Sequence, residues 1–344
     1  MKREPPVASR KSDHIRINIE EDVQSGLTNG LEHYSFVHQA LPDVNLDMID
    51  TTLNLFGRNL ASPLLISSMT GGTAEAESIN LTLAEAAQRT GIAMGLGSQR
   101  AAIDSPEWEK TFRVRQKAPD ILLFANLGAI QLNYGYGVEH CQRAVDMVQA
   151  DALFLHLNPL QEALQSEGET HFSGLLMKIE QVCRGLSVPV VIKEVGWGIS
   201  AETAVRLASA GVQAVDVAGA GGTSWSQVEM FRTHNEHDRR IAGLFRDWGI
   251  PTAEAIRQVK QAAPDLLVFA SGGLKNGLDI AKCIALGAAV GGMAGPFLKA
   301  AAISLDETVQ SIDEVKKTIQ ISMFAAGVPS LHALAQTKLN HRGF

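Results

Sequence analysis

The segment DALFLHLNPL, residues 151–160, decides how the rest of the chain is interpreted. Its body is a near-continuous apolar run, which is typical of a strand buried on both faces of a parallel sheet. The run then ends in LHLNPLQE, residues 155–162, where a His, an Asn, a Gln and a Glu lie close together. A polar tip on a core strand indicates either a helix start or a shared functional site.

Seven other segments repeat this pattern of an apolar, β-prone run with a polar or glycine-rich tip. They are residues 63–72, 91–100, 120–129, 188–198, 212–225, 265–273 and 288–297. Helical stretches separate them, and strands alternating with helices predict an α/β fold with a parallel sheet. Eight such units match a closed (β/α)8 TIM barrel, a fold of ~250 residues.

A doubly wound open sheet is the alternative fold, and the position of the glycines separates the two. The open sheet would have its glycine-rich phosphate turn after the first strand. Here the glycine-rich segments are residues 218–225, 271–277 and 291–297, after the sixth, seventh and eighth runs. TIM barrels often bind a phosphate near the last two strands. The glycines therefore favour the barrel, although glycines also serve tight turns and close packing.

The segments that flank the barrel have their own character. Residues 1–60 are predicted to form a polar N-terminal extension that ends in a hairpin around Gly57, suited to plug the N-terminal mouth of the barrel. The barrel is assigned to residues 61–304. Residues 305–344 are predicted to be a C-terminal helical segment. One face of that segment carries Ile312, Val315, Ile319 and Met323.

The composition excludes several classes of protein. Hydrophobic residues make up 45% and charged residues 19%, as in soluble globular proteins. A net charge of −7 argues against a nucleic-acid partner. The three cysteines have no metal-like spacing, which favours a reducing compartment and a cytoplasmic protein. The chain start lacks an apolar signal region and the most apolar stretch, residues 283–298, is short, so no membrane span is expected.

The tip at residues 158–162 has two interpretations. Asn158 as N-cap, Pro159 as first helical residue and Gln161 in a capping box predict a helix start, and Glu162 would favour the helix dipole. This interpretation does not explain His156, which belongs to the strand itself. In a barrel all eight strand ends meet at one rim, where active sites are built, so capping and function can coexist.

Lys193 ends the apolar run VVIK, where an unpaired ammonium would be costly to bury. Its partner is either Glu194 or a cofactor anion. Neighbouring side chains of a strand point to opposite faces, which favours the cofactor.

Further cations lie in RKSDH, with Arg10, Lys11 and His14, and at Arg100 in the second tip. The first group alone would be interpreted as a solvated charge cluster. Together with Arg100 it could clamp a diphosphate.

With these residues laid out, the chain resembles the type 2 isopentenyl-diphosphate delta-isomerases, a family of flavin enzymes. The resemblance covers nearly the whole length, and FRTHNEHDRRIAGLF, residues 231–245, is the segment least like the family. The matching segments are RKSDHI, SSMTGG, GLGSQR, ANLGAIQL, LHLNPLQE, IKEVGWG, GAGGTSW, DWGIPTAEA, ASGGLKNG and AGPFLKA.

The resemblance implies an isomerase of isoprenoid biosynthesis that converts isopentenyl diphosphate to dimethylallyl diphosphate without net redox change. It implies FMN as cofactor, reduced with NADPH and acting as acid and base, Mg2+ on the diphosphate, and a homo-oligomer, a tetramer or octamer. One carboxylate suffices for the metal, since Mg2+ commonly shares substrate phosphates and keeps several waters.

The resemblance also implies roles for individual residues. FMN would be held by Ser68, Met69, Thr70, Ser98, Asn126, Lys193 and Thr223, and its phosphate by Gly272, Gly273, Ala294 and Gly295. The substrate would be bound by Arg10, Lys11, Ser98, Gln99, Arg100, His156 and Gln161. Gln161 would be the catalytic residue near the reacting carbons, and Glu162 would be the metal ligand.

Three other functions are weighed against this one. The first is an FMN-dependent oxidoreductase of the 2-hydroxy-acid oxidase type on the same barrel, but RKSDH, SQR and NPLQE suit a diphosphate and a metal better than a carboxylate. The second is an inosinate-type dehydrogenase, which needs a nucleophilic cysteine on a rim loop. Cys141, Cys183 and Cys283 all fall in predicted helices. The third is a non-catalytic flavin-binding regulator.

Overall fold

The computed structural model describes residues 13–14, 16–18, 20–69 and 71–341. Its centre is a closed barrel of parallel strands in the order β10-β11-β4-β5-β6-β7-β8-β9, so the predicted (β/α)8 TIM barrel is confirmed. Every predicted run contains one of these strands. They are β4 (Leu64–Ile66), β5 (Ala93–Gly95), β6 (Leu123–Gly128), β7 (Ala152–His156), β8 (Val190–Lys193), β9 (Ala214–Asp216), β10 (Leu267–Ala270) and β11 (Val290–Met293).

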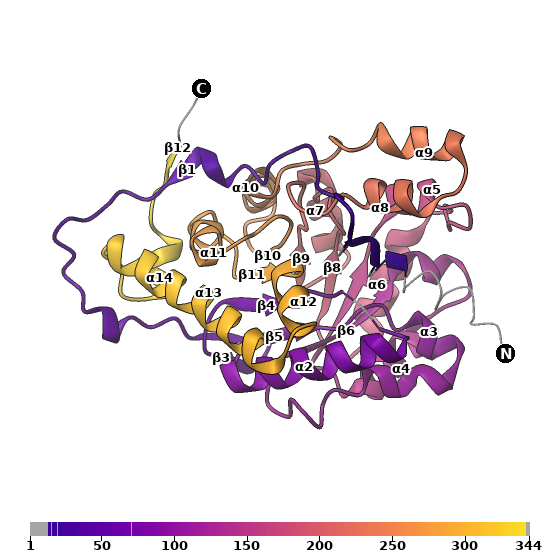
Figure 1. The fold of residues 1–344 in the computed structure, drawn as a ribbon, viewed down its shortest axis with the longest axis horizontal. Helices are drawn as coiled ribbons and strands as arrows, with labels where there is room; N and C mark the ends of the chain where they lie inside the picture. Colours follow the sequence, from indigo (N-terminus) through magenta and orange to yellow (C-terminus); the bar gives the residue numbers. More distant parts are fainter. Residues whose placement is uncertain (1–12, 15, 19, 70, 342–344) are drawn as a thin grey trace.

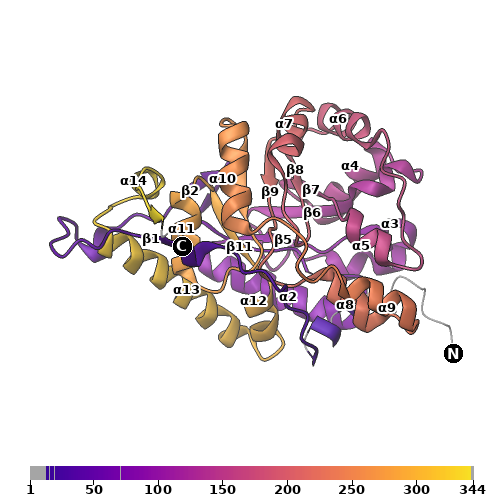
Figure 2. The same cartoon turned by 90° about the horizontal axis from the view of Figure 1, so that it is seen from above.

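Helices alternate with these strands and surround them in the view from above (Figure 2). The three cysteines lie in α4, α6 and α11, as predicted. The helices are α2 (Ala74–Thr90), α3 (Arg100–Asp104), η3 (Pro106–Phe112), η4 (Ala129–Asn133), α4 (Val138–Val148), α5 (Pro159–Leu164), α6 (Leu175–Gly185), α7 (Ala201–Ser209), α8 (Trp225–Arg232), α9 (Glu236–Gly243), α10 (Thr252–Ala262), α11 (Gly277–Ala285) and α12 (Gly295–Ala301). In the part of the chain described here, no helix combines the length and apolar character needed to cross a bilayer.

The barrel interior is filled by an aromatic layer. Phe124 and Phe154 stack with ring centroids 4.4 Å apart, and Phe269 meets both rings edge-on. Successive side chains on a strand point to opposite faces, so the next inward position lies two residues further on. These next positions are polar, which places a polar layer directly above the aromatic layer at the carboxyl ends of the strands.

The predicted hairpin around Gly57 consists of β2 (Leu53–Leu55) and β3 (Arg58–Leu60). Its turn residues Phe56 and Gly57 have φ of 50° and 80°, the left-handed values that a two-residue hairpin turn requires. Leu55 and Leu60 are buried in the same cluster as the interior aromatic residues, and the Phe56 ring contacts the rings of Phe124 and Phe269. The hairpin therefore closes the end of the barrel opposite the polar layer.

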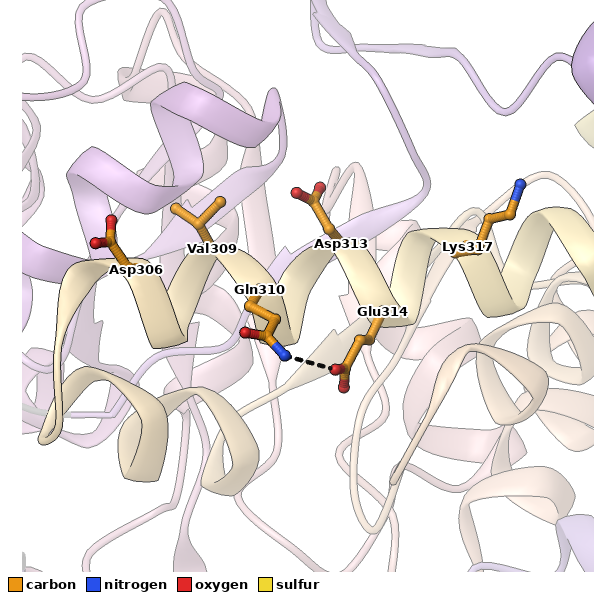
Figure 3. Close-up of a pocket in the computed structure, with 6 residues that line it drawn as sticks. All are labelled: Asp306, Val309, Gln310, Asp313, Glu314 and Lys317. Atoms are coloured by element: carbon orange, nitrogen blue, oxygen red, sulfur yellow. Dashed lines mark hydrogen bonds between the residues drawn. The ribbon is translucent and has the colours of Figure 1, made fainter.

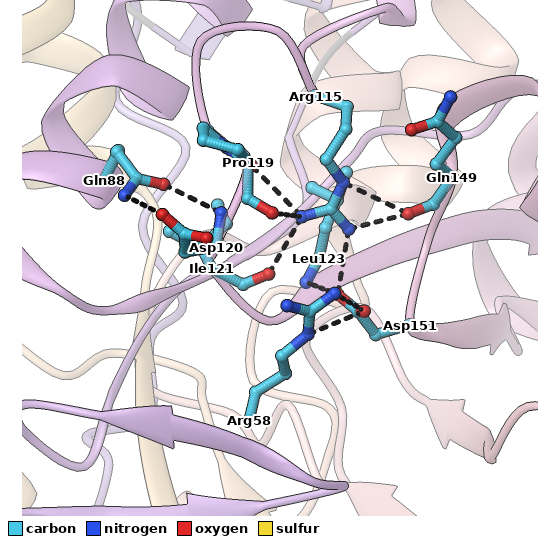
Figure 4. Close-up of polar contacts among 10 residues, drawn as sticks. Arg58, Gln88, Arg115, Pro119, Asp120, Ile121, Leu123, Gln149 and Asp151 are labelled. Atoms are coloured by element: carbon cyan, nitrogen blue, oxygen red, sulfur yellow. Dashed lines mark hydrogen bonds and ion pairs between the residues drawn. The ribbon is translucent and has the colours of Figure 1, made fainter.

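Asp151, just before β7, pins this hairpin to the barrel (Figure 4). Its Oδ1 accepts hydrogen bonds from Nε and Nη2 of Arg58 at 2.9 and 2.7 Å. Its Oδ2 accepts from Nη2 of Arg115 at 2.8 Å and from the backbone N–H of Leu123 at 2.9 Å. One carboxylate thus joins the hairpin, the segment before β6 and the start of β7.

The N-terminal extension and the C-terminal segment pair with each other outside the barrel. Strand β1 (Tyr34–Ser35) pairs with β12 (Asn340–His341) in an antiparallel ladder, close to the C-terminal mark in Figure 1. The predicted apolar face of α13 (Leu305–Ala325) is buried, and this helix packs against α2, α11 and α12. Short helices complete these segments: η1 (Leu31–His33), η2 (Leu46–Met48) and α14 (Leu331–Ala335).

We expect Asp151→Ala to lower the free energy of unfolding by about 3 kcal/mol, because it leaves two guanidinium groups without their shared carboxylate. The midpoint of urea unfolding measures this loss. Asp120→Ala is the control, since this exposed carboxylate accepts a hydrogen bond from the neutral amide of Gln88 and its loss should shift the free energy by less than about 0.5 kcal/mol. Equal effects of the two substitutions would contradict the anchoring role of Asp151.

Candidate active site at the barrel rim

The carboxyl ends of β4 and β5 bring several predicted flavin ligands to the rim. Ser67 and Ser68 follow β4, and each has a buried hydroxyl without a hydrogen-bond partner among the described residues. Met69 packs against the core. Ser98 lies half-buried between β5 and α3, and Thr70 lies outside the described residues. Buried hydroxyls without partners are uncommon in folded proteins and fit a site for a ligand.

Asn126 and His156 form one side of the polar layer. Asn126 donates from Nδ2 to the carbonyl of Leu96 at 2.9 Å, which turns its Oδ1 toward the imidazole. His156 Nδ1 lies 2.8 Å from this oxygen, so Nδ1 is the donor and the ring is held in a fixed orientation. The structure therefore brings a predicted flavin ligand and a predicted substrate ligand into direct contact.

Gln99 has a supporting place rather than an open one. Its side chain is fully buried, donates to the carbonyl of Ala144 at 2.8 Å and accepts from the backbone N–H of Asn126 at 2.9 Å. The backbone N–H of Gln99 donates a hydrogen bond to the backbone carbonyl of Asn126. The geometry therefore links Gln99 to β6 and α4 and gives no support for direct substrate contact through its amide.

Lys193 ends β8 and Glu194 is the first residue after it, and their charged groups have different partners. Lys193 is buried, and its ammonium donates to the carbonyl of Glu194 at 2.6 Å rather than to the carboxylate. The Glu194 carboxylate accepts three backbone N–H groups, from Val195, Gly196 and Trp197, at 2.6 to 2.7 Å. Burial raises the pKa of Glu194 to about 7, although these three bonds oppose the rise. Glu194 thus shapes the turn after β8 and leaves Lys193 to the barrel interior.

Asp216, which the sequence analysis did not single out, lies beside Lys193 in the register of β8 and β9. It is fully buried, its Oδ1 accepts from the hydroxyl of Ser271 at 2.7 Å, and its Oδ2 has no hydrogen-bond partner among the described residues. Burial raises the pKa of Asp216 above its usual value, against the opposing charge of Lys193. A charge inside an apolar run was the signal that identified Lys193, and the same signal in VQAVDVAG would have identified Asp216.

The tip that opened the sequence analysis forms α5, which begins at Pro159 as predicted, with Asn158 as its N-cap residue. The Asn158 side chain makes no capping hydrogen bond. It donates instead to Oε1 of Gln161 at 3.2 Å and to Oε1 of Glu162 at 2.8 Å. The capping interpretation is therefore right about the helix start and wrong about the side-chain contacts.

Gln161 contacts Glu229 of α8, a second residue that the sequence analysis missed. Gln161 Nε2 donates to Glu229 Oε1 at 3.0 Å, and His14 Nε2 lies 3.2 Å from the same oxygen. Arg232 donates to Oε2 at 2.6 Å. Burial alone would raise the pKa of Glu229, but the hydrogen bonds of His14 and Gln161 and the charge of Arg232 lower it below its usual value. No local sequence motif identifies Glu229. His14 and Gln161 come from distant segments of the chain, and Arg232 lies one helical turn further along α8.

Arg100 at the start of α3 is paired rather than exposed. Both terminal nitrogens of its guanidinium donate to the carboxylate of Glu169, at 2.8 and 2.7 Å. Burial lowers the pKa of Arg100, but this ion pair outweighs burial and raises it. Arg10 and Lys11 lie outside the described residues, so of the RKSDH cations the structure places only His14, at Glu229.

The glycine-rich tips after β9 and β10 pack against each other. A Cβ on Gly273, whose φ is 74°, would lie 2.3 Å from the carbonyl oxygen of Gly221, and Gly272 also has a positive φ, of 102°. The N-terminal extension covers this contact, since Asn29 Nδ2 donates to the carbonyl of Gly273 at 2.7 Å. Thr223 meets the extension through a hydrogen bond to Asn18 at 3.4 Å.

The third glycine-rich tip, after β11, has open space at Gly295, unlike the closely packed glycines after β9 and β10. Ala294 precedes α12 and Gly295 begins it. A Cβ on Gly295 would meet no described atom within 4 Å. Space at a helix start suits a phosphate.

Two surface hollows lie on the outer helices instead of at this rim. One follows the exposed face of α13 (Figure 3), and the other lies between η3 and α4. The residues that line them include none of the predicted site residues in the described part of the chain. The first hollow is lined by Asp306, Val309, Gln310, Asp313, Glu314 and Lys317.

Comparisons with known proteins identify the family of the chain. A family model described as FMN-dependent dehydrogenase matches residues 20–107 and 139–341. The isopentenyl-diphosphate delta-isomerase of Synechocystis sp. is 55% identical over 331 residues, which cover 96% of this chain and 95% of that protein. The chain belongs to the isopentenyl-diphosphate delta-isomerases, within the FMN-dependent dehydrogenase family. Isopentenyl-diphosphate delta-isomerases of Nostoc sp. and Rickettsia bellii are 53% and 51% identical and cover 95% and 96% of this chain, and the alignments cover 93% and 98% of those proteins.

Solved structures with the same fold include mandelate oxidases. One variant superposes with a TM-score of 0.70 and 18% identity, covering 98% of this chain and 100% of that chain. A second, with an FMN adduct, gives a TM-score of 0.68 at 19% identity and covers 95% of this chain and 99% of that chain. At this level of identity the likeness concerns the fold alone.

We expect Asp216→Asn to change how stability depends on pH. Since burial raises the folded-state pKa of Asp216 above its usual value of 3.8, its contribution to stability is present below that value and is lost as the pH rises through the folded-state pKa. The variant should therefore gain stability relative to the natural protein as the pH rises above 3.8, measured as the thermal unfolding midpoint.

Glu85→Gln is the control with the opposite sign, because hydrogen bonds from Lys117 and Arg89 lower the pKa of Glu85. That variant should lose stability relative to the natural protein as the pH rises. Parallel pH curves for the natural protein and Asp216→Asn would contradict the assignment of a raised pKa to Asp216.

Proposed function

We propose that this protein interconverts isopentenyl diphosphate and dimethylallyl diphosphate by a 1,3-allylic proton shift, as a step of isoprenoid biosynthesis. The observation that carries the proposal is the 51–55% identity with proteins of that name over nearly the whole of both chains. An FMN-dependent 2-hydroxy-acid oxidase is the alternative on the same barrel. It has weaker support, since the mandelate oxidases share only 18–19% identity.

The rim fits FMN. The hydroxyls of Ser67 and Ser68 have no hydrogen-bond partner within the described part of the chain, Lys193 brings a buried ammonium to the barrel interior, and a Cβ on Gly295 would meet no described atom within 4 Å. When bound and reduced with NADPH, FMN would supply the acid and base that move a proton between two carbons. Lys193 would hold negative charge on the flavin ring, Asn126 would orient its neighbours, and the tips at Gly272, Gly273 and Ala294 would receive its phosphate.

The other half of the rim suits a diphosphate and Mg2+. Arg100 and His156, with Arg10 and Lys11 of the extension, would bind the diphosphate oxygens through charge-assisted hydrogen bonds. Glu162 would bind the metal, and Asn158 holds its carboxylate in place at 2.8 Å. The described residues contain no cluster of three His, Cys, Asp or Glu groups around a metal position, which fits a metal shared with substrate phosphates.

Gln161 would act at the reacting carbons. Its amide nitrogen donates to Glu229, so its orientation is fixed by a carboxylate that His14 and Arg232 also hold. At this end of the substrate, the reacting carbons would face the linked side chains of Gln161, Glu229 and His14 rather than bulk water. Exclusion of water protects a carbocation-like transition state from capture.

We also propose a cytoplasmic location, on the cysteine pattern, and assembly into a homo-oligomer, a tetramer or octamer, on the family resemblance. The apolar side chains exposed at Leu244 and Trp248 are compatible with subunit contacts.

The test of the function is direct. Purified protein should be yellow and, with FMN reduced by NADPH and with Mg2+ present, should convert isopentenyl diphosphate to dimethylallyl diphosphate, detected by proton NMR. Without reductant the conversion should stop. Oxidation of a 2-hydroxy acid with no isomer formed would favour the oxidase, and bound flavin without either reaction would favour a regulator.

We expect Gln161→Ala to lower kcat by roughly 100-fold or more with little change in KM, because an interaction made mainly in the transition state is lost. Steady-state kinetics with isopentenyl diphosphate measure both parameters. Gln142→Ala on α4, whose amide bonds the exposed Asp146, is the matched control and should leave both unchanged. Full turnover in Gln161→Ala would remove Gln161 from the catalytic role.

A further inference from the structure

Glu169 lies in the segment between α5 and α6 and joins two parts of the proposed site. Its carboxylate accepts Nη1 and Nη2 of Arg100 at 2.8 and 2.7 Å, and Gln131 Nε2 at 2.7 Å. Its backbone N–H donates to Oε2 of Glu162 at 2.8 Å. One residue therefore contacts the cation assigned to the diphosphate and the carboxylate assigned to the metal.

The segment around Glu169 is held closely against α5. A Cβ on Gly168 would lie 1.7 Å from the carbonyl oxygen of Glu162, so only glycine allows this approach. The Glu169 side chain is 16% exposed and that of Arg100 is 27% exposed, which shields their ion pair from solvent. A bidentate pair of this kind fixes both the position and the plane of a guanidinium.

We propose that Glu169 is a positioning residue that sets the spacing between Arg100 and Glu162 for a metal–diphosphate complex. The inference rests on the proposed function, because it takes its meaning from the roles assigned to those two residues. A diphosphate that shares a metal with Glu162 must reach Arg100 with its free oxygens, so the distance between cation and carboxylate decides how tightly the complex binds. Glu169 contacts Arg100 through its side chain and Glu162 through its backbone N–H, so a single residue links the two groups.

Arg100 keeps donors for a ligand while it is paired with Glu169. A guanidinium has five N–H groups, and the pair with Glu169 uses one on each terminal nitrogen. Asp104 lies 3.7 Å from Nε, beyond hydrogen-bonding distance. The Nε–H and the remaining terminal N–H groups can therefore bind a phosphate oxygen without breaking the pair.

The experiment compares Glu169→Ala, Glu169→Gln and the natural enzyme, each with reduced FMN bound. Glu169→Ala should raise KM for isopentenyl diphosphate roughly tenfold or more and raise the Mg2+ concentration for half-maximal activity, with kcat changed far less. Both variants keep the backbone N–H that bonds Glu162, but only Glu169→Gln keeps an acceptor oxygen for the guanidinium, so its KM should lie between those of Glu169→Ala and the natural enzyme. A merely structural role would lower active-enzyme concentration and kcat instead.

Two controls isolate the contact. Glu85→Ala removes a carboxylate in the C-terminal half of α2 that pairs with Arg89 and Lys117. It should leave KM and the Mg2+ dependence unchanged. In the background of Arg100→Ala, the further change Glu169→Ala should add little to KM, because the carboxylate acts through the guanidinium.

Binding of inorganic pyrophosphate with Mg2+, measured by calorimetry, separates this inference from the proposed function. Weaker binding to Glu169→Ala supports the positioning role even if no isomer is formed. Isomer formation with unchanged KM and unchanged pyrophosphate affinity in Glu169→Ala overturns it while the function stands. Tighter binding or a lower KM in Glu169→Ala also overturns it, since Glu169 would then compete with the diphosphate for Arg100.

Discussion

The two-residue alternation of side chains along a closed set of parallel strands is the constraint on which the whole site depends. Phe124, Phe154 and Phe269 fill the barrel interior, with the first two rings stacked and the third edge-on to both. The next inward positions must therefore carry their side chains toward the carboxyl ends of the strands. Because the hairpin at Phe56 closes the other end, every interior polar group faces one rim. Residues far apart in the sequence become neighbours there without any local motif to join them.

The pKa values of two carboxylates at this rim shift in opposite directions because their neighbours differ. Glu229 has the guanidinium of Arg232, the ring of His14 and the amide of Gln161 as partners, and its pKa is lowered despite burial. Asp216 has one hydroxyl, one backbone N–H and the more distant ammonium of Lys193, and its pKa is raised. Environments that push titratable groups apart are typical of sites that move protons. The rim thus holds a carboxylate of lowered pKa beside Gln161 and a carboxylate of raised pKa beside Lys193, and one environment could not produce both shifts.

The sequence was enough to predict the barrel, its eight strands, the hairpin and the buried face of α13, since all four follow from periodicity and turn chemistry that act locally. It also identified Lys193 and the polar tip of β7, because charge or hydrogen-bonding capacity in an apolar run is costly unless it is used. The sequence did not identify Glu229 and Glu169 as site residues, because each lies in a polar stretch where a carboxylate is common. Their importance comes from partners contributed by other segments, namely His14 and Gln161 for one and Arg100 and Gln131 for the other. Such long-range pairs have no signature in a single sequence.

The glycine-rich tips show how one set of residues serves packing and binding together. Gly221 has a φ of 119°, and a Cβ there would lie 2.2 Å from the backbone nitrogen of Asn29, so the extension can lie against this loop only because glycine is present. Ser25 donates its N–H to the carbonyl of Gly222 at 2.8 Å, which completes the backbone pairing on the outer side. The close-packing interpretation of these glycines is therefore right for the face that meets the extension. The same extension also brings His14 to 3.2 Å from Glu229, so it contributes a side chain to the candidate site as well as packing against the barrel.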